Sequence, residues 1–388
     1  MNWFKPKIPL AWLQLTREKI RLLVALAGIS FACILMFMQL GFQEALFDSA
    51  ILFHQSIQGD VFLISPQSNA LIAMATISQR RLYQALNFAE VESISPMYLG
   101  FALWKNPENG RTRSIFVVGI DPTDDILDLP QFEAADLERI KRQDVVIFDQ
   151  ASRPEFGPIL EWSNQGRHVT TEVGGRQVTV EGLFHMGATF GADGNIITSD
   201  LNFLRIFEQR QTGIIEVGVI NLQPGVDLES ILSRMREFYP ADVTVFSKEE
   251  FVEFERSYWA ESTAIGFIFG LGTMMGFIVG IVIVYQILYT DVSDHLAEYA
   301  TLKAMGYADR YLLGVVFQES IILGVLGYIP GFSLSLLLYD LTQNATLLPI
   351  VMTLERSSFV FTLALTMCFL SGAIAVRKLR AADPADIF

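Results

Sequence analysis

The chain has 388 residues, of which 51% are hydrophobic and 18% charged, and its mean hydropathy is +0.37. It is too apolar for an ordinary water-soluble protein, whereas its polar part is too large for a simple bundle of membrane helices. We therefore expect a membrane protein with one sizeable water-exposed domain. The net charge of −14 does not favour a nucleic-acid partner. Both cysteines, Cys33 and Cys368, fall in apolar runs, so neither a disulfide framework nor a cysteine zinc site is expected.

Residues 1–21 combine aromatic and aliphatic side chains with five basic residues and the single acid Glu18. This pattern is typical of an amphipathic helix that lies on an anionic membrane surface. The start of a cleaved signal peptide is the alternative, but the apolar run that follows is too long for one. We expect the segment to be retained as a cytoplasmic interfacial helix.

Four apolar runs are long enough to cross a membrane. The first, 22–42, has no charge over 21 residues, which at about 1.5 Å per residue spans roughly 31 Å. The other three are 264–289, 312–338 and 358–376. The predicted fold class is an α-helical membrane protein with four transmembrane helices, arranged 1+3, and a large extracytoplasmic α+β domain between the first and second.

The long polar segment 43–263 changes from helical runs to short strand-like ones. Strands are predicted at 59–66, 97–104, 113–120, 144–148, 176–184, 214–222 and 242–246, and helices at 77–88, 134–142, 227–238 and 248–262. We expect 59–104 and 214–246 to form two halves of a split ferredoxin-like unit, with a β-rich insertion at 111–210.

Basic residues indicate the orientation of the spans. Five lie near the first span, and the tail 377–388 begins with RKLR, so the positive-inside rule places both termini in the cytoplasm. The loop 290–311 is then cytoplasmic and the short loop 339–357 periplasmic. The 17 basic and 32 acidic residues of 43–263 are compatible with an outer location but do not establish it.

Within the cytoplasmic loop, the stretch Asp291–Gly306 has the pattern of a short capped helix. Ser293 or Asp294 can act as the N-cap, and Gly306 fits a C-terminal glycine cap. Its simplest interpretation is a solvated connector between two spans.

Motifs for catalysis are absent from the sequence. There is no Gly-Lys dipeptide and therefore no Walker A loop, so if the protein uses ATP, another chain hydrolyses it. The four histidines lack metal-ligand spacing, and there is no GxSxG elbow. His185 and Asp193 could form a ligand pair, although a solvated loop is the simpler interpretation. We predict no enzyme, no catalytic residue, no metal and no cofactor bound by this chain.

Two features inside the spans are candidates for a role. Gly272, Gly276 and Gly280 form overlapping GxxxG steps that favour close helix packing, within the chain or between two copies; glycine as filler is the alternative. Gln318 and Glu319 lie about 10 Å into the third span. An ionisable group at that depth suggests a functional site, but proximity to the interface leaves simple solvation as an equal alternative.

The layout of one span, a large outer domain and three spans resembles the MacB/FtsX-like (type VII) ABC transporter permeases. The resemblance includes EYATLKAMGYADRYL after the second span, FQESIILGVLGYIPG in the third and RKLRAADPADIF at the end. It covers essentially the whole chain and is greatest to the cyanobacterial DevC-type permeases, in which no ATPase domain is fused to the membrane chain.

This resemblance implies a homodimer in the bacterial inner membrane, bound by two copies of a separate ATPase that carries ATP and Mg²⁺. It also implies a periplasmic adaptor, an outer-membrane channel, and a glycolipid or other amphiphile as cargo. Movement of the ATPase would be transmitted to the outer domain. The helix that contacts the ATPase would include Glu298, Tyr299, Leu302, Lys303, Met305 and Gly306.

Two other functions stay open on sequence alone. The same movement could regulate a periplasmic hydrolase without transporting anything. Alternatively, residues 43–263 could hold the active site of a membrane-anchored enzyme or sensor, although this leaves the cytoplasmic helix unexplained.

Overall fold

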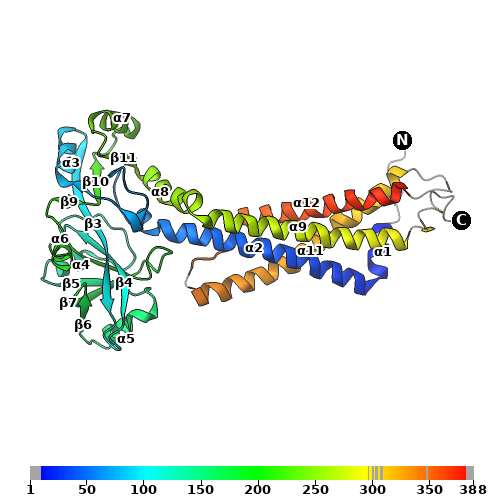
Figure 1. Cartoon of the computed structure of the whole chain (residues 1–388), viewed down its shortest axis with the longest axis horizontal. Helices are drawn as coiled ribbons and strands as arrows, with labels where there is room; N and C mark the ends of the chain where they lie inside the picture. Colours follow the sequence, from blue (N-terminus) through cyan, green and yellow to red (C-terminus); the bar gives the residue numbers. More distant parts are fainter. Residues whose placement is uncertain are drawn as a thin grey trace. The chain divides into compact units, whose positions relative to one another are not determined.

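The computed structural model describes residues 10–381 except 296, 299–300, 302–304, 306–308 and 347. The chain divides into two compact units (Figure 1). We call Met1–Ala45 with Ala264–Phe388 the helical unit, and Leu46–Thr263 the inserted domain. Four long apolar helices and an α+β domain between the first and second confirm the predicted fold class.

The helical unit begins with the short helix α1 (Leu10–Arg17), which packs against α11. The helices α2 (Lys19–Ser56), α9 (Ala264–Asp294), α11 (Asp309–Thr346) and α12 (Leu354–Ala381) each contain a stretch long and apolar enough to cross a membrane. Helix α12 packs along both α9 and α11. Their shared core includes Met36, Phe37, Leu323 and both cysteines.

The end of α9 differs from the sequence prediction. The helix continues to Asp294, and the Ser293 hydroxyl donates a hydrogen bond back to the carbonyl of Tyr289, 2.5 Å away. The N-cap assignment of Ser293 or Asp294 was therefore wrong, because both residues belong to the last turn of α9. The apolar run ends at residue 289, but the backbone hydrogen bonds of α9 continue through the polar residues that follow, so the helix is longer than the apolar run.

Four strands and two helices of the inserted domain come from two stretches far apart in the sequence. The first contributes β1 (Val61–Ile64), α3 (Gln79–Gln84) and β3 (Val91–Lys105); the second contributes β10 (Val217–Leu222), α7 (Leu228–Phe238) and β11 (Thr244–Ser247). The strands pair antiparallel in the order β11-β1-β10-β3. Two strand–helix–strand repeats in this order form a split ferredoxin-like unit.

The insertion extends the same sheet from β3. Its strands are β4 (Thr112–Ile120), β5 (Val145–Asp149), β6 (Val169–Val173), β7 (Arg176–Phe184) and β8 (Asn195–Ser199). They follow in the order β3-β4-β8-β5-β7-β6, and β6 bridges back to β3 where Trp104 faces Val173. The strands thus form a ring, and Trp104, Phe148 and Phe156 pack in the core beside it.

Short elements complete the inserted domain. The helices are α4 (Ala134–Ile140), α5 (Ile159–Asn164), α6 (Asp200–Ile206) and α8 (Lys248–Ser257), with the short turns η1 (Leu71–Ala73), η2 (Ala85–Asn87) and η3 (Pro154–Phe156). A π-helix, η4 (Tyr258–Ser262), follows α8 directly. Strands β2 (Ile77–Ser78) and β9 (Ile214–Ile215) form a separate pair, so the helix predicted from residue 77 begins at Gln79 instead.

Candidate functional site

The predicted ATPase-contacting residues lie between α9 and α11. Glu298 and Met305 are exposed, whereas Tyr299, Leu302, Lys303 and Gly306 lie outside the described residues. The amide of Met305 donates to the carbonyl of Thr301, 3.0 Å away, a helical spacing within this segment. The segment follows the last turn of α9, where Asp291 and Asp294 anchor it to the rest of the helical unit.

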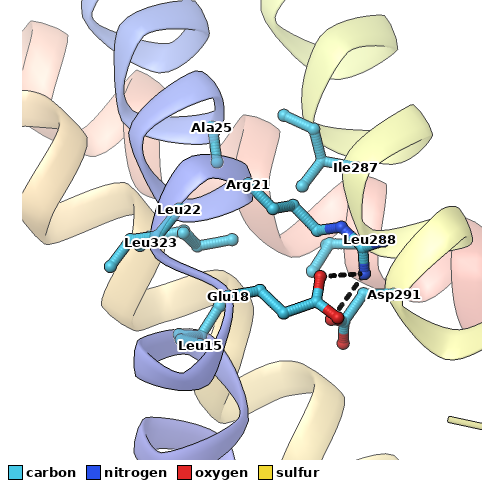
Figure 2. Close-up of a pocket in the computed structure, with 9 residues that line it drawn as sticks. All are labelled: Leu15, Glu18, Arg21, Leu22, Ala25, Ile287, Leu288, Asp291 and Leu323. Carbon is cyan, nitrogen blue, oxygen red and sulfur yellow. Dashed lines mark ion pairs between the residues drawn. The ribbon is translucent and has the colours of Figure 1, made fainter. Parts of the chain in front are cut away.

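That anchor is an ionic cluster around Arg21, near the start of α2. Its guanidinium contacts three carboxylates: Glu18 at 3.0 Å, Asp294 at 2.5 Å and Asp291 at 3.6 Å. Figure 2 shows Arg21 reaching from α2 toward Asp291 on α9, with Glu18 beside it. We call Glu18, Arg21, Asp291, Asp294, His295 and Glu319 the Arg21 cluster.

Asp291 is the buried member that α9 contributes. Its side chain is buried, and its backbone carbonyl lies 3.0 Å from Nδ1 of His295, which is also buried. The small cavity of Figure 2 is lined by Leu15, Leu288 and Leu323 as well as by the charged groups. Low-polarity walls strengthen the attraction between Arg21 and Asp291 relative to the same pair in water.

Glu319 enters the cluster from α11. It is 0% exposed, its carboxyl group neighbours that of Asp291, and neither oxygen has a hydrogen-bond donor among the described residues. Gln318, the other candidate from the sequence, is exposed, so only Glu319 of the two belongs to the cluster. Helix α11 begins at Asp309, which puts Glu319 about 15 Å along it. Its burial is incompatible with the simple-solvation alternative.

The cluster has more acidic than basic groups. One guanidinium faces Glu18, Asp291 and Asp294, and Glu319 adjoins the most buried of these. Buried carboxylates are costly unless a cation or a proton compensates them, so removing Arg21 would leave them unpaired. The arrangement therefore ties the start of α2 to the end of α9, beside the segment predicted to contact an ATPase.

A second ionic site, which the sequence analysis missed, lies at the other end of the helical unit. The buried Arg356 of α12 donates from Nε to Glu44, 3.1 Å away, and from Nη1 to the carbonyl of Val351 and the hydroxyl of Tyr339. Tyr339 in turn donates to the carbonyl of Phe37. The sequence did contain an indication of this site, because Arg356 is the one basic residue in the short loop 339–357 before the fourth predicted span. This site joins α2, α11 and α12.

The three glycines of α9 that the sequence analysis singled out face neighbouring helices within the chain. A Cβ at Gly272 would meet Gln39, one at Gly276 would meet Leu35 and Met36, and one at Gly280 would lie 3.0 Å from Ala32 and closer still to Met367. Close approach of α9 to α2 and α12 therefore depends on these positions.

No group of three or more potential metal ligands occurs among the described residues. Asp193 forms ion pairs of 2.7 Å with both Arg113 and Arg153, while His185 is exposed. The carboxylate of Asp193 is thus already engaged, which disfavours the metal pair considered from the sequence.

Residues 262–384 match the family model described as FtsX-like permease C-terminal, a range that covers α9, α11 and α12. This part of the chain is similar to the FtsX-like permease domain, in agreement with the FtsX-like part of the resemblance described above. The narrower DevC-type assignment stays a prediction. No curated protein matches the chain.

Two solved structures align with about half of the chain. One is the periplasmic region of MacB from Actinobacillus actinomycetemcomitans, at 10% identity and a TM-score of 0.36, covering 51% of this chain and 92% of that one. The other is the extracellular domain of the noncanonic ABC-type transporter YknZ from Gram-positive bacteria, at 12% identity and a TM-score of 0.32, covering 49% and 100%.

Proposed function

We propose that this chain is the membrane subunit of an ABC exporter that transmits the movement of a separate ATPase to the inserted domain. The match of residues 262–384 to the FtsX-like permease domain carries the proposal. The ATPase would supply ATP and Mg²⁺, because the sequence has no phosphate-binding loop of the Walker type.

The segment between α9 and α11 is the proposed contact with the ATPase. Asp291, in the last turn of α9 just before this segment, is bound to Arg21 of α2, so a displacement of the segment would reach α2 as well as α9. Helix α2 is unbroken from Lys19 to Ser56 and has neither glycine nor proline after Gly41. Packed helices shift as rigid units, which makes α2 a suitable element for transmission.

The remaining assignments follow the resemblance described above. We propose a homodimer in a bacterial inner membrane, with both termini cytoplasmic and the inserted domain in the periplasm. A periplasmic adaptor and an outer-membrane channel would complete the export path. The DevC-type resemblance suggests a glycolipid or other amphiphile as cargo.

The proposal predicts that Glu298→Ala combined with Leu302→Ala reduces ATPase-coupled export at least about tenfold while insertion stays intact. The matched control is Glu355→Ala, an exposed acid at the start of α12. Export would be measured with the co-expressed partners, together with ATPase co-purification. Normal export by a correctly inserted double variant would refute the contact assignment.

A strain that lacks the protein distinguishes transport from regulation. Loss of wall-hydrolase activity, with no substance accumulating inside cells that lack the protein, would favour the alternative of a non-transporting regulator. Mass spectrometry of lipid that co-purifies with the wild-type protein would identify an amphiphilic cargo directly.

A further inference from the structure

A buried acid–histidine pair lies inside the inserted domain, where the chain enters it along α2 and leaves it along α8. His54, near the end of α2, and Glu255, near the end of α8, are 0% and 1% exposed. Nε2 of His54 is 3.6 Å from Oε2 of Glu255. Neither histidine nitrogen has a hydrogen-bond partner in the described part of the chain.

Glu255 connects three segments. Its Oε2 accepts a hydrogen bond from the amide of Leu71 in η1, and its Oε1 accepts one from the indole of Trp259 in the π-helix η4, both at 2.7 Å. Trp259 also packs edge-on against Phe190, with 4.9 Å between ring centroids. One carboxyl group thus holds η1 and η4 together and faces the end of α2.

Aromatic rings exclude water from this pair. The His54 ring lies 4.5 Å from that of Phe251 and contacts Phe53, and Phe251 stacks on Phe62. The nearby cation is Lys248, whose Nζ donates to the carbonyls of His54 and Gln55 and so caps the end of α2. Arg256 is paired with Asp48, 3.6 Å away.

We propose that Glu255 and His54 form a proton-binding latch, in which a proton held between the two side chains fastens α2, η1 and α8 together and its loss loosens them. The bound proton would lie between Oε2 of Glu255 and Nε2 of His54. It comes from the medium around the inserted domain and returns there on release. The proposal concerns the inserted domain alone and does not depend on transport.

The balance of forces on Glu255 supports this. Burial raises the pKa of Glu255 to about 7, although its hydrogen bonds from Trp259 and Leu71 favour the ionised form and lower it. Opening of the latch returns the carboxyl to water, where its ordinary pKa is 4.5. The closed latch therefore binds the proton more tightly than the open one, so opening increases as pH rises from about 4.5 to about 7 and is constant above.

The test is hydrogen–deuterium exchange of the full chain in lipid nanodiscs between pH 5 and 8, corrected for intrinsic exchange rates. We expect the protection of the Leu71 amide to fall by about tenfold or more up to pH 7 and then to level off. Glu255→Gln removes the titrating group, so protection of the Leu71 amide in this variant should not vary with pH. The control Glu253→Gln changes an exposed acid on the same helix and should behave as wild type.

A second variant tests the histidine. His54→Phe keeps a ring against Phe251 but removes both nitrogens, so Leu71 protection at pH 5 should fall toward its value at pH 8. Wild-type exchange in His54→Phe, or an unchanged pH dependence in Glu255→Gln, would overturn the latch. Both results are independent of whether the protein exports anything.

Discussion

Arg21 is the residue on which the helical unit's ionic cluster depends. It lies 273 positions before Asp294 in the chain, yet the two side chains are in contact. Nothing in a short sequence window indicates that such distant charges meet, which explains why the sequence analysis singled out Glu319 but did not identify its neighbours. The burial of Glu319 and the exposure of Gln318 also required the structure, because adjacent residues of a helix point in different directions.

We predict that Arg21→Gln destabilises the helical unit by about 3 kcal/mol, because it leaves buried Asp291 without its cation. The melting temperature of the detergent-solubilised full chain should fall accordingly. The matched control is Arg17→Gln, an exposed arginine on α1 that should leave it unchanged. Equal melting temperatures for the two variants would show that the cluster adds no stability.

Restoring the balance of charge gives a further prediction. In the Arg21→Gln background, Asp291→Asn removes the unpaired buried charge and should recover about half of the lost stability, or more. The measurement is a double-mutant cycle on the melting temperature. Additive losses from the two substitutions would indicate that Arg21 and Asp291 do not interact.

At the scale of elements, the four apolar helices were predictable because the thickness of a bilayer fixes the length of an uncharged run. The helix ends were not, since α9 extends through polar residues to Asp294. In the inserted domain, β6 and β8 and the helices α5 and α6 were not predicted. These elements are only five to seven residues long, and β8 depends on pairing with β4 and β5, which are distant in the sequence.

Packing along α9 can be tested with two glycines of the same helix. A side chain at Gly280 would overlap Ala32 and Met367, whereas a Cβ at Gly270 meets nothing within 4 Å. We expect Gly280→Leu to cost about 1–3 kcal/mol through overpacking. Gly270→Leu should be neutral in the same thermal unfolding assay. Similar effects of the two substitutions on thermal unfolding would mean that Gly280 is not needed for close helix packing.

The whole molecule consists of two units with separate hydrophobic cores. Two clusters of buried residues lie within the inserted domain and a third within the helical unit. The two-unit layout was predictable from the change in hydrophobic period. The ring of strands in the insertion was not, because it closes between β3 and β6, which are distant in the sequence and meet at Trp104 and Val173 and at a hydrogen bond from the Gly174 amide to the carbonyl of Leu103.

Because each unit has its own core, residues 46–263 should fold when produced alone. We expect one cooperative thermal transition by circular dichroism and dispersed amide signals by NMR. A fragment in which Lys248 is replaced by Met should melt lower, since the carbonyls at the end of α2 lose their donor. A fragment without a cooperative transition would mean that the domain needs the membrane helices.

The closure of β6 on β3 has a consequence for protein quality control. It leaves β11 as the free edge of the nine-stranded sheet, and β11 is only four residues long. The guanidinium of Arg236 on α7 already donates to the carbonyl of Val245 on that strand, 3.2 Å away. Sheets of different molecules join through exposed edge strands. The edge strand of this sheet is short, and one of its carbonyl groups already accepts a hydrogen bond. Copies concentrated in a crowded compartment should therefore resist strand-to-strand aggregation without a chaperone to cover that edge.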